Sequence, residues 1–236
     1  MRLLLIRHGE SQNNRIHADT GSWAGRTPDP ELTGLGRRQA ERLAQHFRAG
    51  HLTPPDVLLT SLMRRAVGTA APIARALDLP LEGDLLLHEV GGVFDAADEG
   101  PHVTGVPHLG SPASTLLELS PHLVLPGEVD EDGWHRRPFE PPAAAWQRAC
   151  EVADSLLERF GDSDITVGLV THAWFSQYLL HALLGWQPGE DGRLSAWLVI
   201  NNTGHTLLEL HPGPDWPPAL VWLNRHDHLP EDEVTG

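Results

Sequence analysis

Short apolar runs alternate along the chain with longer stretches in which apolar residues recur at helical spacing. Residues 3–6 and 165–171 are the clearest runs, and a continuous aliphatic run is typical of a parallel strand that is covered on both faces. We predict strands over residues 3–6, 57–60, 85–87, 165–171, 196–200, 206–210 and 220–223. We predict helices between Leu32 and Gly50 and over residues 62–77, 143–160 and 174–184.

The order of these elements decides the predicted fold. Strands alternate with helices for most of the length, which favours a parallel sheet whose crossover helices cover both of its faces. We therefore predict an α/β fold, a three-layer sandwich with a mostly parallel central sheet and helices on both faces. The 236 residues, of which 40% are hydrophobic, suit a single domain over residues 1–236.

Loops are predicted where glycine, proline and polar residues gather. Residues 12–31 are predicted to form a loop region with at most a helical turn, and Thr33 is the predicted N-cap of the helix that follows. Residues 201–204 are predicted to join the two strands on either side of them in a hairpin. The polar tail after Asn224 is expected to be mobile.

The segment from residue 91 to residue 142 has a different texture. It holds eight of the 20 prolines and seven of the 23 glycines, mixed with acidic residues, and a short helix is possible at residues 114–119. The segment is longer than an ordinary connection between two elements. We interpret it as an insertion over the edge of the sheet, and its length favours a lid or a substrate-selecting segment.

Composition and charge exclude several classes of protein. The formal net charge of -15 argues against nucleic acid or an acidic membrane surface as a partner. Cys150 is the single cysteine, so an intramolecular disulfide and a cysteine-based zinc site are excluded. The sequence shows no leader peptide and no apolar segment of membrane-spanning length, and we expect a cytoplasmic protein.

The chain has fifteen histidines, which raises the question of a metal site. The run His226-Asp227-His228 is the strongest candidate near the C-terminus. Because no matching cluster with zinc-type spacing occurs elsewhere, we interpret these residues as surface histidines. The expected set of metals and cofactors is therefore empty.

Charged residues follow four of the predicted strands at their carboxyl ends. Arg7 and His8 follow the first strand, Arg65 lies in the first turn of the helix after the second, Glu89 follows the third, and His172 ends the strand over residues 165–171. Ligands of open α/β sheets bind at this edge. A histidine after a strand or a lone pair of arginines is more often structural, but together these groups suit a tetrahedral dianion such as phosphate.

Phosphoryl transfer is the chemistry that this set supports. We predict that His8 is the nucleophile, because neighbouring arginines keep its imidazole neutral. Arg7 and Arg65 would hold the phosphoryl oxygens, and His172 would stabilise the charge on the transferring group. Glu89 would donate a proton to the leaving alkoxide and then activate water, so that no metal is needed.

The segment from Leu5 to Ser11, together with Asn14, resembles the signature of the histidine phosphatase superfamily, also called the phosphoglycerate mutase-like family. Further similar segments lie at residues 32–40, 60–70, 87–89 and 170–172, in the family's order, and the resemblance covers roughly residues 1–90 and 143–210. It implies a phosphohistidine intermediate on His8. It also implies the phosphate ligands Arg7, Arg65 and His172, a supporting Asn14, and Glu89 as acid and base.

The resemblance leaves the reaction open between phosphatases and mutases. One departure from the family's pattern is Ala173, which follows the second histidine where glycine is common. Mutases that resemble this chain carry an arginine and a tyrosine after the glutamate, whereas Glu89 is followed by Val-Gly-Gly-Val. We therefore predict a phosphatase that acts on a small phosphorylated metabolite. A mutase-type phosphotransferase is the alternative, favoured by Arg136 and Arg137, which resemble the paired arginines that bind a carboxylate in mutases.

An inactive phosphate-binding regulatory module is the third hypothesis. Such a module would keep the pocket and use the insertion to bind a protein. The presence of both His8 and Glu89 makes this hypothesis the weakest, because modules of this kind tend to lose the groups that chemistry requires.

Overall fold

A seven-stranded sheet runs through the middle of the structure, a computed structural model that describes residues 1–22, 24–96, 105–211 and 216–236. The strands lie in the order β6-β3-β2-β7-β1-β8-β9. Their bounds are β1 Arg2–Arg7, β2 Val57–Ser61, β3 Leu81–Asp84, β6 Leu123–Val124, β7 Thr166–Thr171, β8 His205–Glu209 and β9 Ala219–Arg225. The first five strands in this order pair in parallel, and β8 and β9 continue the sheet in antiparallel fashion.

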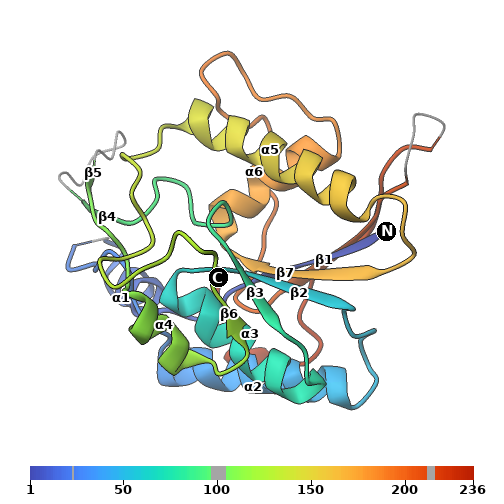
Figure 1. Ribbon diagram of the computed structural model, residues 1–236, viewed down its shortest axis with the longest axis horizontal. Coiled ribbons are helices and arrows are strands. Elements are labelled where there is room, and N and C mark those ends of the chain that lie inside the picture. Colours follow the sequence, from blue (N-terminus) through green and yellow to red (C-terminus); the bar gives the residue numbers. More distant parts are fainter. Residues whose placement is uncertain (23, 97–104, 212–215) are drawn as a thin grey trace.

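Helices cover both faces of this sheet. Figure 1 shows α5 and α6 above it and α2, α3 and α4 below it. The helices are α1 Gln12–Thr20, α2 Gly34–Arg48, α3 Arg64–Leu77, α4 Ala113–Leu119, α5 Pro142–Phe160 and α6 Ala173–Leu183, and a short 3-10 helix, Glu231–Glu233, lies near the C-terminus. The predicted three-layer α/β fold is confirmed.

The sequence of β1 explains why the sheet lies in the centre. Leu3 and Leu5 pack into the core beneath α5 and α6, whereas Leu4 and Ile6 pack against α2 and α3. All four side chains are at most 2% exposed. Because successive residues of a strand point to opposite faces, an unbroken aliphatic run is stable only where both faces are covered.

The strand predicted over residues 85–87 is wrong. Residues 81–84 form β3 instead, although their sequence, Leu-Glu-Gly-Asp, has one apolar residue. The strand ends where Asp84 Oδ1 accepts a hydrogen bond from Leu86 N at 2.7 Å. Only Leu81 of this strand is fully buried, so the strand can form without the continuous apolar run that was used to predict buried strands.

The hairpin predicted for residues 196–210 is also wrong in its first half. β8 is present, but it pairs with β1 and β9, and residues 196–200 form no strand. The side chain of Gln177 explains this result, because it accepts from Leu198 N at 2.8 Å and donates to Leu198 O at 2.7 Å. A buried carboxamide thus replaces a strand partner.

A helix occupies part of the region that was predicted as a loop. Residues 12–20 form α1, which begins at a capping box: Ser11 Oγ accepts from Asn14 N, and Asn14 Oδ1 accepts from Ser11 N. The helix ends at Gly21, which has a φ of 68°. Local hydrogen bonds therefore define a helix that has almost no apolar periodicity.

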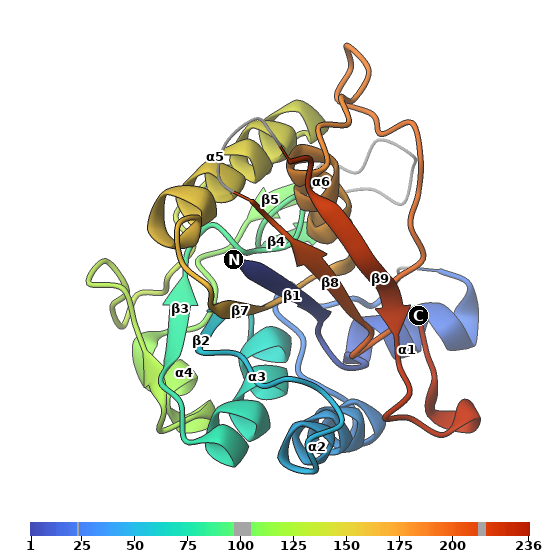
Figure 2. The same ribbon diagram turned by 90° about the vertical axis from the view of Figure 1, so that its right-hand side faces the viewer.

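The C-terminal tail is ordered against the body of the protein, contrary to the predicted mobility. Glu233 forms ion pairs with Arg38 at 3.2 Å and Arg42 at 2.7 Å, and Gln39 Nε2 donates to Glu233 O at 2.8 Å. Asn202 N donates to Thr235 O at 2.8 Å. Figure 2 shows the C-terminus close to α1 and the end of β9.

The segment predicted as an insertion, residues 91–142, is built into the fold at two places. β4 (Phe94–Ala96) and β5 (Gly105–Pro107) pair in antiparallel fashion, and β6 extends the central sheet beside β3. The predicted short helix is α4, and residues 97–104 lie outside the described part of the chain. Figure 1 shows β4, β5 and α1 on the side of the sheet away from the N-terminus, where the parallel strands end.

None of the helices in the described ranges is long and apolar enough to cross a membrane.

The turn after β1 packs tightly against the start of α2. A Cβ atom at Gly36 would lie 2.0 Å from Glu10 O, and one at Gly9 would lie 2.6 Å from Gly36 O. These two glycines therefore let the backbone after β1 touch the helix directly.

We expect Gly36→Ala to lower the free energy of unfolding by about 1–3 kcal/mol, because backbone atoms must move to admit the methyl group. Urea denaturation measures this change. The control is Gly34→Ala, whose Cβ would meet nothing closer than Arg38 Nη1 at 4.0 Å. If both substitutions leave the free energy of unfolding within about 0.5 kcal/mol of the parent, the backbone can admit a side chain at residue 36 and the expectation is wrong.

Candidate active site

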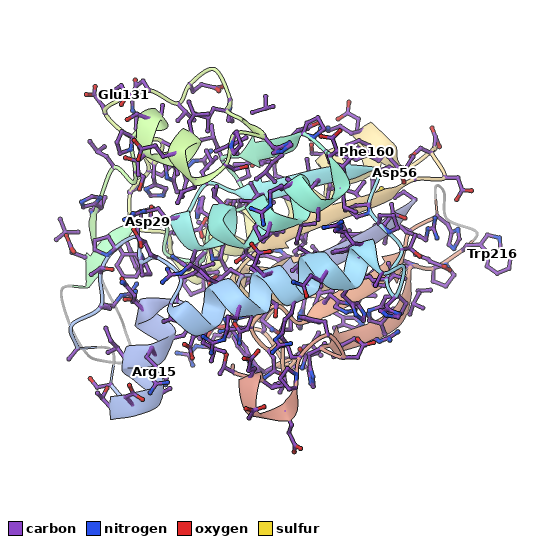
Figure 3. The ribbon with its side chains drawn as sticks, turned by 90° about the horizontal axis from the view of Figure 1, so that it is seen from below. Arg15, Asp29, Asp56, Glu131, Phe160 and Trp216 are labelled. Atoms are coloured by element: carbon purple, nitrogen blue, oxygen red, sulfur yellow. The ribbon has the colours of Figure 1, made fainter. Side chains whose placement is uncertain are left out.

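The ends of three adjacent parallel strands bring the predicted residues together. Arg7 pairs in register with Thr171, and Thr60 with Val170, so that β1, β7 and β2 end at the same edge. The rings of His8 and His172 lie 5.1 Å apart between centroids. Figure 3, which views the molecule from below, shows α2 and α3 in front of the sheet, with Asp29 at this end of the molecule and Asp56 at the other.

Hydrogen bonds fix the tautomer of His8. Its Nδ1 lies 2.7 Å from Gly9 O, a carbonyl that can only accept, so the ring hydrogen is assigned to Nδ1. Arg65 Nε lies 3.1 Å from His8 Nε2 and donates to it. The lone pair of Nε2 is therefore the reactive position of this ring.

The surroundings of His8 hold its imidazole in the neutral form. The side chain is 3% exposed, and desolvation lowers its pKa well below 6.5, with further lowering by the charges of Arg65 and Arg7. A neutral imidazole keeps its lone pair, which a nucleophile requires.

His172 stands at the N-cap position of α6, directly after β7. Its Nε2 lies 2.8 Å from Ser61 Oγ, which accepts from Met63 N at 3.3 Å and can donate its own hydrogen to the ring. In that tautomer, His172 Nδ1 carries the hydrogen, and this buried atom has no hydrogen-bond partner among the described residues. It is the N–H that His172 can offer to a ligand.

Two buried arginines surround His8. Arg7 Nη1 donates to Ile200 O at 2.6 Å, while Arg7 Nε is buried with no hydrogen-bond partner in the described structure. Burial lowers the pKa of Arg7 to about 10, which leaves it charged at neutral pH. Arg65 is 8% exposed, and burial lowers its pKa, opposed mainly by the charge of Asp29. The two guanidinium groups thus place positive charge beside His8, which suits a phosphoryl group.

Asp29 offsets part of that positive charge, a role that the sequence did not suggest. Its carboxylate accepts from Arg64 N at 3.0 Å at the start of α3 and from Ser111 Oγ at 3.0 Å. A carboxylate at the N-terminus of a helix is stabilised by the helix dipole. Asp29 therefore links α3 to the segment over residues 91–142 and compensates for the arginines in the first turn.

Glu89 reaches the site by capping the helix that follows His172. Glu89 Oε1 accepts from Val90 N and Phe175 N, both at 2.9 Å, and Oε2 accepts from Trp174 N at 3.3 Å. The charge of Glu89 opposes the lowering of the pKa of both Arg7 and Arg65. The carboxylate therefore lies at the same strand edge as both arginines and His172.

A buried ion pair holds the loop that carries Glu89. Arg148 on α5 contacts Glu140 through two hydrogen bonds of 2.7 and 2.6 Å. Arg148 Nη1 also donates to Leu86 O and His88 O, and its guanidinium lies 4.1 Å from the centre of the Phe175 ring. The side chain of Arg148 thus joins the loop before Glu89 to α6, the helix that Glu89 caps.

The remaining predicted site residues fall into two groups. Asn14 lies near the pocket: its Oδ1 accepts from Ser11 and, at 3.5 Å, from Asn202 Nδ2, which leaves its amide hydrogens as the group for a phosphate oxygen. Arg136 lies at the surface in an ion pair with Asp130. Arg137 is exposed, and its charge helps to lower the pKa of His88.

Sequence reasoning missed Ser61, Asp29, Arg148 and Arg26. Arg26 lies 4.4 Å from the centre of the Phe94 ring, and its charge contributes to lowering the pKa of Arg65. Ser61 ends β2, and its place at a strand end was a usable signal. The other three come from loops or from the middle of a helix, where no local pattern distinguishes them.

We expect Arg148→Lys to lower kcat about 10- to 100-fold, because a lysine keeps the charge beside Glu140 but loses the planar contacts that hold the Glu89 loop. Steady-state kinetics with a fixed phosphomonoester measures the change, and KM should move less than kcat. Arg159→Lys is the control, since Arg159 lies on the same helix in an exposed pair with Glu82. A kcat of Arg148→Lys equal to that of the control would contradict this positioning role.

We expect His8 to stay neutral when the pH falls through 6.5. Its folded-state pKa is depressed, so protonation begins only well below that pH. ¹⁵N NMR of histidine-labelled protein between about pH 7.5 and 5 follows the ring directly across the range in which an ordinary histidine titrates. The Nδ1–H form should persist, and Arg65→Gln should raise the pKa of His8. A midpoint near 6.5 in the parent protein would contradict the account.

The sequence of this chain is similar to those of several known proteins. The family model described as "Histidine phosphatase superfamily (branch 1)" matches residues 3–96. A 2,3-bisphosphoglycerate-dependent phosphoglycerate mutase of Mycobacterium bovis is 46% identical over 243 residues, covering 99% of this chain and 80% of that protein. A protein of the same name from Nocardia farcinica is 39% identical over 90 residues, 37% of this chain and 34% of that protein, so this match spans about a third of the relative's length.

Solved structures share the fold over nearly the whole chain. A phosphoserine phosphatase mutant from Entamoeba histolytica in complex with phosphoserine has a TM-score of 0.61 and 22% identity, covering 97% of this chain and 98% of that one. A mycobacterial glucosyl-3-phosphoglycerate phosphatase has a TM-score of 0.58 and 20% identity, covering 94% and 98%. At these identities the likeness shows the common fold.

Proposed function

Since the chain belongs to the histidine phosphatase superfamily, we propose that it hydrolyses a small phosphomonoester without a metal ion, through a phosphohistidine on His8. The observation that carries this proposal is the state of His8. The ring is neutral, its hydrogen is held on Nδ1 by Gly9 O, and Nε2 presents its lone pair beside Arg65.

In the first step, His8 Nε2 attacks phosphorus and the bond to the ester oxygen breaks. Arg7, Arg65 and His172 Nδ1 hold the phosphoryl oxygens and stabilise the charge that gathers on them. Glu89, a carboxylate in the free site, takes up a proton as the phosphate dianion binds and gives it to the departing alkoxide. Its Oε2 suits this task, because it accepts one long hydrogen bond whereas Oε1 accepts two short ones.

In the second step, water replaces the histidine on phosphorus. Glu89, now ionised, accepts a proton from the water, whose oxygen bonds to phosphorus as the bond to His8 Nε2 breaks. Inorganic phosphate leaves, Glu89 is protonated again, and His8 returns to its neutral form. Atoms and charge balance without a metal or a redox partner.

Two features support a phosphatase over a mutase. Gly91 and Gly92, with φ of 90° and 80°, follow Glu89 and Val90 and bring no side chain that could hold a second phosphate group. Tyr178, the single tyrosine, is buried and donates its hydroxyl hydrogen to Gly192 O at 3.1 Å. It therefore does not substitute for the tyrosine that resembling mutases place after the glutamate.

A mutase-type phosphotransfer is the second candidate, because relatives carry that name, one of them along 99% of this chain. Arg137 is then the better of the two candidate carboxylate ligands, since Arg136 is paired with Asp130. An inactive phosphate-binding module is less well supported, because His8 and Glu89 both stand in positions that chemistry requires.

The substrate is proposed to be a small phosphorylated metabolite that the segment over residues 91–142 selects. Ser111 of this segment is tied to Asp29, and Phe94 stacks on Arg26. Both contacts lie beside the arginines of the pocket. The segment is therefore positioned to contact the organic group to which the phosphate is esterified.

We expect the parent protein to release phosphate from a panel of phosphorylated sugars, glycerates and nucleotides, and His8→Ala to lose at least about 1,000-fold of that rate, because no other group supplies the nucleophile. A colorimetric phosphate assay in the presence of a chelator measures both rates. His211→Ala, an exposed histidine, is the control. Equal release by His8→Ala would contradict the phosphohistidine mechanism.

A separate measurement decides between hydrolase and mutase. Phosphoglycerate is incubated with the parent protein, with and without a bisphosphate primer, and isomerisation and phosphate release are followed together. The proposal expects release of phosphate and no primed isomerisation. Primer-dependent isomerisation that exceeds hydrolysis would establish the mutase.

A further inference from the structure

Three side chains that the proposed reaction does not use converge where β8 begins. They are His205, the first residue of β8, and Asp227 and His228 from the segment after β9, and one ligand atom from each lies within 4.8 Å of the others. We propose that these residues bind a divalent transition-metal ion, with Zn²⁺ as the ion that best fits two imidazoles and a carboxylate. The site is independent of the proposed reaction.

His228 presents a bare acceptor to this cluster. Thr203 Oγ1 donates its hydrogen to Asn202 O at 2.7 Å, so it accepts from His228 Nε2 at 2.9 Å. The hydrogen of the neutral ring is then on Nε2, and the lone pair is on Nδ1. That atom is buried and has no hydrogen-bond partner in the described structure. A hydrogen bond that fixes the tautomer in this way is a usual feature of a metal-binding histidine.

Asp227 Oδ2 accepts a hydrogen bond from Arg225 Nη2 at 2.6 Å, whereas the two nearby histidines lie too far from the carboxylate for hydrogen bonds. His205 Nε2 lies 3.6 Å from Asp227 Oδ1, and His46 Nε2 lies 3.7 Å from Oδ2. Two ligands at about 2.1 Å from one tetrahedral ion lie about 3.4 Å apart, close to the first of these separations. The hydrogen bond from Arg225 holds the second carboxylate oxygen, as outer partners of metal ligands do, and leaves Oδ1 to face the cluster.

The ring of His205 is buried, and so is the Nδ1 atom of His228. Asp227 is 43% exposed, which gives an ion a route to the site from solvent.

Two contacts oppose metal binding. The guanidinium of Arg225, paired with Asp227, repels a cation, and Trp222 holds His205 in the tautomer that carries its hydrogen on Nε2. The second contact can report on metal binding. Trp222 Nε1 donates to His205 Nδ1 at 3.1 Å, which assigns the hydrogen of His205 to Nε2. Ligation through Nε2 moves that hydrogen to Nδ1, where it would face the indole N–H, so Trp222 must turn away. Removing this donor should therefore tighten metal binding.

The ion would brace a turn next to the catalytic strand. Thr203, which holds His228, donates its N–H to Arg7 O at 3.0 Å, and Asn202 Nδ2 donates to His8 O at 2.9 Å. His205 follows directly in β8. A bound ion would join this turn to the segment after β9 and stabilise the folded state.

Cobalt titration of the tag-free protein at neutral pH tests the site, because tetrahedral Co²⁺ absorbs visible light and replaces Zn²⁺ at such donors. We expect saturation at one ion per chain, displacement by Zn²⁺ and a higher melting temperature. Asp227→Asn and His228→Ala should each weaken binding by more than the roughly 10- to 100-fold that is typical of losing an outer partner. His211→Ala is the control, and Trp222→Phe should bind several-fold more tightly.

Circular dichroism without metal shows whether each variant folds. If His228→Ala does not fold, cobalt binding by Asp227→Asn alone decides whether the site exists. Absence of a saturable cobalt spectrum would overturn the proposal. So would equal binding by Asp227→Asn and His211→Ala, which would indicate adventitious binding to surface histidines. If Trp222→Phe does not bind more tightly, His205 is not a ligand through Nε2.

Discussion

The state of one imidazole governs this site. His8 is buried, its Nδ1–H is held by Gly9 O, and Arg65 donates to its Nε2. Burial removes water from the ring, which lowers the pKa of His8. The guanidinium of Arg65 donates to the lone pair of His8 Nε2 and so further disfavours a proton there. In the proposed reaction the same arginine binds the phosphoryl group, and it must give up its hydrogen bond to Nε2 before that lone pair can attack phosphorus. The proposal therefore makes release of the nucleophile and substrate binding depend on one contact.

The surrounding fold brings this contact together and positions its partners. Parallel strands β1, β7 and β2 end at one edge, and there the chain brings Arg65, Glu89 and His172 to His8 from distant parts of the sequence. Glu89 caps α6, which directly follows His172, so the proposed acid and the second histidine share one helix terminus. The buried Arg148 then fixes the loop before Glu89. The contacts that hold the site are thus largely between segments that are far apart along the chain.

Much of the fold could be predicted from the sequence, because burial on both faces demands the apolar runs of β1 and β7 and the periodicity of α2, α3, α5 and α6. Prediction failed where hydrogen bonds rather than burial decide the structure. Residues 196–200 look like a strand but are held by the carboxamide of Gln177, and α1 depends on the capping box of Ser11 and Asn14. β3 was missed because three of its four residues are only partly buried.

The same division holds for the site. His8, Arg65 and His172 follow strands, and strand ends are visible in a sequence, whereas Asp29 and Arg148 act through tertiary contacts that no local pattern reveals. His205 is another residue whose place in a site could not be predicted from local sequence. The run His226-Asp227-His228 was interpreted as surface histidines, because only the folded chain brings a histidine from the start of β8 beside Asp227 and His228.

The position of phosphorus on the phosphorylated protein tests the central claim most directly. The protein is quenched during turnover of a phosphomonoester, and ³¹P–¹⁵N NMR of histidine-labelled material identifies the bonded nitrogen. We expect phosphorus on Nε2 of His8, because Gly9 O holds the hydrogen on Nδ1. Phosphorus on Nδ1 of His8, or on His172, would contradict the claim.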